Sequence, residues 1–164
     1  VTSVATAWNL NPPEDLKTIW VSRAFICHQL LSLIFEKLPE ALNKSHSRLV
    51  VVSSLPELFC DPDVPRSEAL GSFNAAMAFL SEMAWKRSLL LLISSPRPSN
   101  SWHRATLESL IRSRSNLAVK VEQKASGIQL CAETPKASLS PIPVPIAQPR
   151  AEQSLEGFLG RSHP

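Results

Sequence analysis

The sequence predicts a mixed α/β fold in which helices lie on the faces of a parallel sheet, with an antiparallel C-terminal extension and a proline-rich tail. Two uninterrupted apolar runs, 49–52 and 89–93, are typical of strands covered on both faces. A segment with helical spacing of apolar residues, 67–86, separates them, and this strand–helix–strand order favours parallel pairing. A chain of 164 residues is long enough for one domain with a buried core.

In the first third of the chain we expect a short strand at 19–21, a helix at 26–42 and a strand at 49–52. The helix is predicted because its apolar residues recur at intervals of three and four. Pro39 has no N–H to donate, so it should kink this helix or end it early. Residues 55–65 contain three prolines and two aspartates and are predicted to form a loop.

The second helix, 67–86, carries one apolar stripe that includes Phe73, Met77 and Leu80. A strand, a Ser- and Pro-rich loop and three further strands are predicted after it, at 89–93, 94–102, 105–112, 117–123 and 128–132. We therefore expect one core domain over residues 1–133.

The composition changes after residue 133. Residues 134–153 contain five prolines and almost no side chains that could build a core. We expect an extended, mobile linker over 134–151. A short apolar cluster follows within 152–160, and it is treated below as a separate motif.

Charge and cysteine content exclude little. The net charge is +3, and six basic residues against two acids lie between Arg97 and Lys124. Such a stretch favours a polyanion, although solvated charges are its commoner explanation. The three cysteines have no metal-ligand spacing, so we expect free thiols in a reducing compartment, no metal and no other cofactor. No apolar run is long enough to span a bilayer and no secretory signal is visible, so an intracellular location is expected, in the cytoplasm with the nucleoid or in the nucleus.

Several segments, taken in order, resemble one protein family. Residues 10–16 (LNPPEDL), 19–25 (IWVSRAF) and 28–31 (HQLL) are similar to the stretch after the third core strand of RecA/RadA-type recombinases. Residues 49–58 resemble the Walker B strand and its exit, and 64–66 (VPR) resemble the first DNA-binding loop. Residues 90–95 resemble the next strand. After the second DNA-binding loop, three residues match the family's spacing: His103, Thr106 and Arg112. The resemblance covers about residues 4–124 and implies the C-terminal half of a RecA-like core.

The departures from this family concern its ATPase chemistry. Ser53, followed by Ser54, stands where the Walker B strand of the family ends in an Asp that positions Mg²⁺, and a serine carries no charge to balance a dication. Ser94 and Ser95 replace the polar Asn-Gln pair of the neighbouring strand. None of the four glycines is followed by Lys and Ser or Thr, so the chain lacks the P-loop that would cradle a triphosphate. We therefore expect a pseudo-ATPase and no enzyme activity.

The resemblance implies DNA contacts at the two loops. Arg66, Arg97 and Arg104 are the candidates for the phosphate backbone, and Trp102 could stack on a base. The alternative is that Trp102 packs on the sheet and that the arginines are solvated. His28 and His103 are expected to be hydrogen-bonded structural residues, and Glu57 is a remote candidate for replacing the lost carboxylate.

The tail motif resembles the sliding-clamp binding box, or PIP box. Its consensus is Gln-x-x-Leu-x-x-aromatic followed by an aromatic residue or Leu. Here Leu155 and Phe158 match, Leu159 replaces the second aromatic residue, and Glu152 replaces the Gln. The i, i+3, i+4 spacing lets one helical turn present the three side chains together to an apolar pocket. The alternative is an amphipathic tail that folds back on its own core.

Together these features predict a non-catalytic RecA/RadA paralogue in DNA repair or recombination. Its expected partners are single-stranded DNA, bound weakly, a recombinase-family protein and a sliding clamp, with no membrane. The alternative is a truncated C-terminal part of a DNA-dependent ATPase recombinase, whose P-loop would be encoded upstream of Val1.

Overall fold

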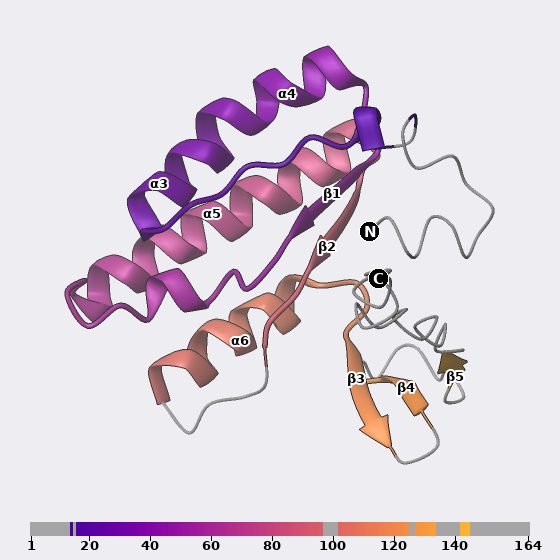
Figure 1. The fold of residues 1–164 in the computed structure, drawn as a ribbon. Helices are drawn as coiled ribbons and strands as arrows, with labels where there is room; N and C mark the ends of the chain where they lie inside the picture. Colours follow the sequence, from indigo (N-terminus) through magenta and orange to yellow (C-terminus); the bar gives the residue numbers. More distant parts are fainter. Residues whose placement is uncertain (1–13, 15, 97–101, 125–126, 134–141, 145–164) are drawn as a thin grey trace, which may run out of the picture. The chain divides into compact units, whose positions relative to one another are not determined.

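The computed structural model describes residues 14, 16–96, 102–124, 127–133 and 142–144 (Figure 1). It shows a mixed α/β protein with a parallel two-stranded sheet and an antiparallel three-stranded sheet, which confirms the predicted fold class at this level. The chain divides into two compact units, residues 20–118 and residues 1–19 with 119–164, and each is described by itself. Among the helices described, none is long and apolar enough to cross a membrane.

The first unit is built on one parallel strand pair. Strands β1 (Leu49–Val52) and β2 (Leu90–Ile93) pair in register from Leu49 opposite Leu90 to Val52 opposite Ile93. Helix α5 (Arg66–Arg87) connects them, as the parallel pairing requires. The predictions for 49–52, 67–86 and 89–93 are thus confirmed. Each of these segments has one clear hydrophobic pattern, which is the primary sequence signal of secondary structure. The loop predicted at 55–65 is also found, and it includes a short 3₁₀ turn, η3 (Glu57–Phe59).

The predicted first helix is found as three consecutive segments. Helix α3 (Cys27–Ser32) continues into a π-helical stretch, η2 (Leu33–Lys37), and then into α4 (Leu38–Ser45). Of the two outcomes expected at Pro39, an early end is therefore not found, and the irregularity is the π-helical stretch directly before it. Its ring would clash with the carbonyl of Phe35 in a regular α-helix, and the π turn directly before it interrupts that regular geometry.

Two strand predictions, at 19–21 and at 105–112, are wrong. Residues 19–21 form no strand, and the side chains of Trp20 and Val21 are exposed. Residues 105–112 lie within helix α6 (Trp102–Arg114). The helix buries Leu107, with Leu110 and Ile111 packed against the same core, and the spacing of these three residues is helical rather than alternating.

The core of this unit lies between α5 and its neighbours. One face of α5 is buried along most of its length, and Phe73 on that face packs edge-on against Phe59 of η3, with ring centroids 5.0 Å apart. The buried members of the core come from α3, η2, α4, β1, the loop after β1, α5 and α6: Cys27, Ile34, Leu42, Val50, Leu55, Phe59, Ala69, Phe73, Ala76, Met77, Leu80, Met83 and Leu107.

The parallel sheet is covered by this core on one face only. Val50 is buried and Val52, Leu91 and Ile93 pack against the core, whereas the alternate residues point the other way. Four large aliphatic side chains on that second face, Leu49, Val51, Leu90 and Leu92, are between 50% and 64% exposed. The expectation that both faces would be covered is therefore wrong for the part of the chain that the structure describes. We call these four residues the open sheet face.

The second unit contains the antiparallel sheet. Strands β3 (Val119–Lys124) and β4 (Gly127–Ala132) pair along their whole length, which confirms the predictions for 117–123 and 128–132. A third strand, β5 (Ile142–Val144), pairs with β4 and falls within the stretch expected to be a mobile linker. A 3₁₀ turn, η1 (Leu16–Thr18), belongs to the same unit.

Candidate functional site at the carboxyl edge of the parallel strands

The carboxyl ends of β1 and β2 are joined by hydrogen bonds beyond the strands themselves. Ser94 N donates to Val52 O at 3.0 Å, and Leu55 N donates to Ser94 O at 3.3 Å. Ser54 N also donates to Ser94 Oγ at 3.3 Å. The serines that follow the two strands are thus brought together, and in open α/β sheets this edge is where ligands usually bind.

Ser53 and Ser54 occupy the position at which the recombinase resemblance expects a carboxylate. Ser53 is exposed, and Ser54 has a φ of 55°, a left-handed conformation that is uncommon for residues other than Gly. The turn this conformation creates sends the chain towards η3. A hydroxyl at this point can donate or accept a hydrogen bond, but it adds no charge to the edge.

Arg104 of α6 lies at the centre of an ion-pair cluster beside this edge. Its Nε is 3.3 Å from Glu108 Oε1, one helical turn away, and its Nη2 is 3.8 Å from Glu57 Oε1. The Arg104 and Glu108 side chains are only 15% and 13% exposed. Because Arg104 is shielded and compensated by two acids, it is a poor candidate for an exposed phosphate contact.

The same cluster fastens the exit of β2. Ser95 Oγ donates to Glu108 Oε1 at 3.1 Å, and Arg104 Nη2 donates to Pro96 O at 3.4 Å. The loop after β2 is therefore held against α6 at its start. We call Glu57, Arg104 and Glu108 the Arg104 cluster.

Cys60 and His103 complete this region. Burial raises the pKa of the Cys60 thiol, and the acids Glu108 and Glu57 add to that rise while Arg104 opposes it. The His103 ring Nε2 lies 3.0 Å from Phe59 O, which agrees with the structural role expected for this histidine. The three cysteines are free thiols.

The chemistry available at this edge is that of hydroxyls and of two acids that share one arginine. Glu57, the remote candidate for a replacement carboxylate, has Arg104 as its ion-pair partner rather than standing alone. In the described ranges no three His, Cys, Asp or Glu side chains gather closely enough to hold a metal ion. The arrangement fastens a turn and a loop to a helix.

The other predicted site residues are scattered. Arg66 is exposed at the first position of α5, and Trp102 is the first residue of α6. The remaining members of the predicted set lie outside the described residues: Arg97, Leu155, Phe158 and Leu159. Among the described candidates for DNA contact, only Arg104 is placed against the carboxyl edge by hydrogen bonds and ion pairs that the structure gives.

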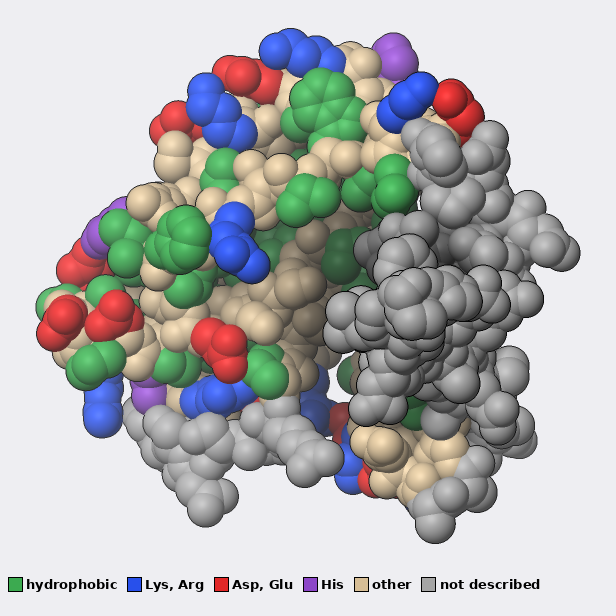
Figure 2. Space-filling view, in the orientation of Figure 1, with side chains coloured by type: hydrophobic (Ala, Val, Ile, Leu, Met, Phe, Trp, Pro, Cys, Tyr) green, Lys and Arg blue, Asp and Glu red, His purple; other side chains and the backbone are tan. Residues whose placement is uncertain are grey.

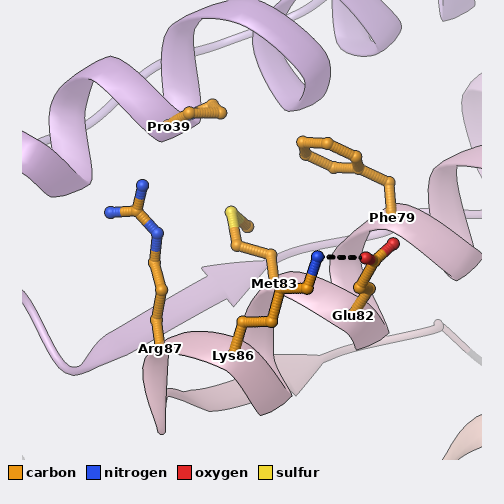
Figure 3. Close-up of a pocket in the computed structure, with 6 residues that line it drawn as sticks. All are labelled: Pro39, Phe79, Glu82, Met83, Lys86 and Arg87. Atoms are coloured by element: carbon orange, nitrogen blue, oxygen red, sulfur yellow. Dashed lines mark ion pairs between the residues drawn. The ribbon is translucent and has the colours of Figure 1, made fainter.

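A second feature lies between α4 and α5, where two rows of residues face each other. Phe35 and Phe79 pack edge-on with ring centroids 5.1 Å apart, and Arg87 Nη1 donates to Asn43 Oδ1 at 2.8 Å. Between these two contacts the helices leave a hollow of about 190 Å³, lined by Pro39, Phe79, Glu82, Met83, Lys86 and Arg87. Figure 3 shows Pro39 facing the α5 side chains across this hollow, with Lys86 paired to Glu82.

The Arg104 cluster was not predicted from the sequence. The signal was present, because Arg104 and Glu108 have the i, i+4 spacing of a helical ion pair, but it is visible only once 102–114 is read as a helix.

Comparison with known proteins adds no further assignment: the chain matches no protein-family model and no curated protein.

Proposed function

We propose that this chain is a non-catalytic, RecA/RadA-like paralogue that acts in DNA repair or recombination by binding other macromolecules. The observation that carries this proposal is the open sheet face. Parallel sheets are normally buried on both faces, and a group of large aliphatic side chains left at about half exposure marks a surface that binds a partner. A recombinase-family protein that contributes an apolar surface is the proposed partner.

The carboxyl edge supports a binding role over nucleotide hydrolysis. Ser53 and Ser54 offer hydroxyls where magnesium-dependent hydrolysis uses a carboxylate. The acids beside this edge, Glu57 and Glu108, are paired with Arg104. An acid that is paired with an arginine stabilises the fold and is a poor ligand for a divalent cation.

The partner proposal can be tested with a charge placed on the open sheet face. Leu92→Asp should weaken binding to a purified RecA/RadA-type recombinase by tenfold or more, because burying a leucine is worth about 1.5–3 kcal/mol. Val21→Asp is the matched control, since Val21 is 86% exposed on an irregular segment and the same charge is added. Binding is measured by analytical ultracentrifugation or surface plasmon resonance, and circular dichroism checks that both variants fold. Wild-type affinity for Leu92→Asp would contradict the proposal.

Two further contacts belong to the proposed function. The motif with Leu155, Phe158 and Leu159, outside the described residues, is proposed to bind a sliding clamp, and its sequence spacing is the support. Weak binding of single-stranded DNA is proposed from the net positive charge and the family resemblance.

A further inference from the structure

Four cationic residues are brought together at the amino edge of the parallel sheet, opposite to the serines. Because β1 and β2 are parallel, α4 and α5 both end where these strands begin. Lys44 lies in the last turn of α4, Lys86 and Arg87 lie in the last turn of α5, and Arg48 directly precedes β1. Far-separated parts of the sequence therefore contribute to one rim.

Hydrogen bonds show that these residues are neighbours. Arg87 donates to Asn43, the residue before Lys44, at 2.8 Å. Leu90 N donates to the carbonyl of Arg48, also at 2.8 Å. The two helix ends and the two strand starts are thus tied together. We call Lys44, Arg48, Lys86 and Arg87 the cationic rim.

The cationic rim keeps most of its charge. All four side chains are exposed, and Lys44 and Arg48 make no ion pair with any residue that the structure describes. Lys86 pairs with Glu82, and Arg87 gives one guanidinium N–H to Asn43 and has others to offer. Figure 2 shows Lys and Arg side chains, with Asp and Glu side chains among them, in the region where Figure 1 places α4. Arg104, by contrast, is shielded by its acids.

One exposed aromatic side chain lies in the same helical turn as two residues of the cationic rim, Lys86 and Arg87. Trp85, in the same last turn of α5, is 87% exposed and is the most exposed of the large apolar side chains that the structure describes. Exposing an indole in water is unfavourable, and the core gains nothing from it. Cations beside an accessible aromatic ring are the combination with which proteins bind single-stranded nucleic acids, because phosphates meet the cations and a base stacks on the ring.

We infer that the cationic rim, with Trp85, is a binding surface for single-stranded nucleic acid. Cations in the last turn of a helix also stabilise the helix dipole, which gives Lys44, Lys86 and Arg87 a second role. Arg48 lies outside both helices, and Trp85 carries no charge. Stabilisation of the helix dipoles therefore does not account for these two residues. This inference rests on the DNA-contacting part of the proposed function and moves the contact from the loops to the opposite edge.

The test compares two double variants of the full chain that lose the same charge. Lys44→Gln with Arg48→Gln removes two cations from the rim, and Arg23→Gln with Arg66→Gln removes two exposed cations elsewhere, one of them the loop candidate. Fluorescence anisotropy with a labelled oligothymidylate of roughly 20 nucleotides is measured at about 50 mM and about 200 mM salt.

The rim variant should bind at least tenfold more weakly than the wild type at the lower salt concentration. Its plot of log affinity against log salt should be shallower by about 1.4, since each contact to single-stranded phosphate contributes about 0.7. Trp85→Leu should weaken binding by about fivefold or more with little change in this slope, because stacking is worth about 1–3 kcal/mol per base. The control variant should bind nearly as the wild type does.

The other outcomes separate the inference from the function on which it rests. A larger loss in the control variant would overturn the rim and return the contact to Arg66, while DNA binding itself would stand. If the rim variant binds oligothymidylate as the wild type does, the inference about the cationic rim is wrong, while DNA binding by the chain still stands. If the wild type binds no oligothymidylate at about 50 mM salt, both the inference and the DNA-contacting part of the proposed function are wrong. Rim-dependent binding to phosphatidylserine vesicles without oligonucleotide binding would identify a lipid surface and overturn the nucleic-acid assignment.

Discussion

Arg104 Nε lies 3.3 Å from Glu108 Oε1, one turn further along α6, and both side chains are largely shielded from water. Arg104→Ala should therefore lower the free energy of unfolding by about 1–3 kcal/mol, because Glu108 would keep its charge at a shielded position without its counter-ion. Urea unfolding followed by circular dichroism measures the change.

Arg66→Ala is the control for this prediction. Arg66 is exposed and makes no ion pair among the described residues, so its loss should change the unfolding free energy by less than about 0.5 kcal/mol. The double variant Arg104→Ala with Glu108→Ala should recover part of the stability lost in Arg104→Ala alone. If Arg104→Ala is as stable as Arg66→Ala, the ion pair with Glu108 contributes nothing measurable to the stability of the fold.

The chain should not bind Mg-ATP with useful affinity. The sequence has no P-loop, and Ser53 stands at the Walker B position. Isothermal titration with Mg-ATP should give no heat of binding. A dissociation constant below about 100 μM, equivalent to about −5.5 kcal/mol, would contradict this prediction.

The Cys60 thiol should react slowly in the folded protein. Its pKa is raised, chiefly by burial, so at pH 8 the folded chain holds less Cys60 thiolate than the unfolded chain. Alkylation by iodoacetamide should be slower in buffer than in urea, and it should accelerate as the pH rises towards the folded pKa. Folding favours the protonated thiol, so this contribution to stability is present at lower pH and is lost as the pH rises through the folded pKa.

Mass spectrometry of the Cys60 peptide follows this reaction separately from those of Cys27 and Cys131. Cys60→Ser identifies the signal. Equal rates of Cys60 alkylation in buffer and in urea at pH 8 would show that the thiol is not protected.

The tail should bind a sliding clamp chiefly through Phe158. A labelled peptide of residues 150–164 should bind purified clamp nearly as well as the whole chain does, and Phe158→Ala should cost about 2 kcal/mol or more, since a buried aromatic commonly anchors such motifs. Shortening the proline-rich stretch before the motif should change the affinity little. If Phe158→Ala instead lowers the melting temperature and the wild-type peptide does not bind clamp, the cluster belongs to the chain's own core.

The elements with long, consistent patterns could be predicted from the sequence. Helix α5 was expected at 67–86 because its apolar stripe runs for several turns, and β1 because four successive apolar residues lie between turn residues. The predictions for short segments were less successful. Residues 19–21 have strand-like composition, but a strand needs a paired neighbour, and the described sheet gives them none.

The site was harder to predict because it depends on contacts between distant residues. Arg104 was assigned to DNA as a loop cation, and only the helical reading of 102–114 places it against Glu108. The cationic rim is spread over two helix ends and a strand start, so no sequence window contains it. Parallel pairing of β1 with β2 assembles it, and that pairing joins residues about 40 positions apart.

The π-helical stretch Leu33–Lys37 has a consequence for the length of this helix. Each residue turns a helix by about 100°, so one residue more or less before Pro39 changes the direction in which every later side chain points. A deletion of one residue from this stretch would restore an ordinary α-helical turn, yet it would rotate Asn43 away from Arg87 and change the direction in which Lys44 points. The chain thus depends on an irregular turn to aim side chains that lie more than one helical turn downstream, and a homologue without that turn should not share the rim.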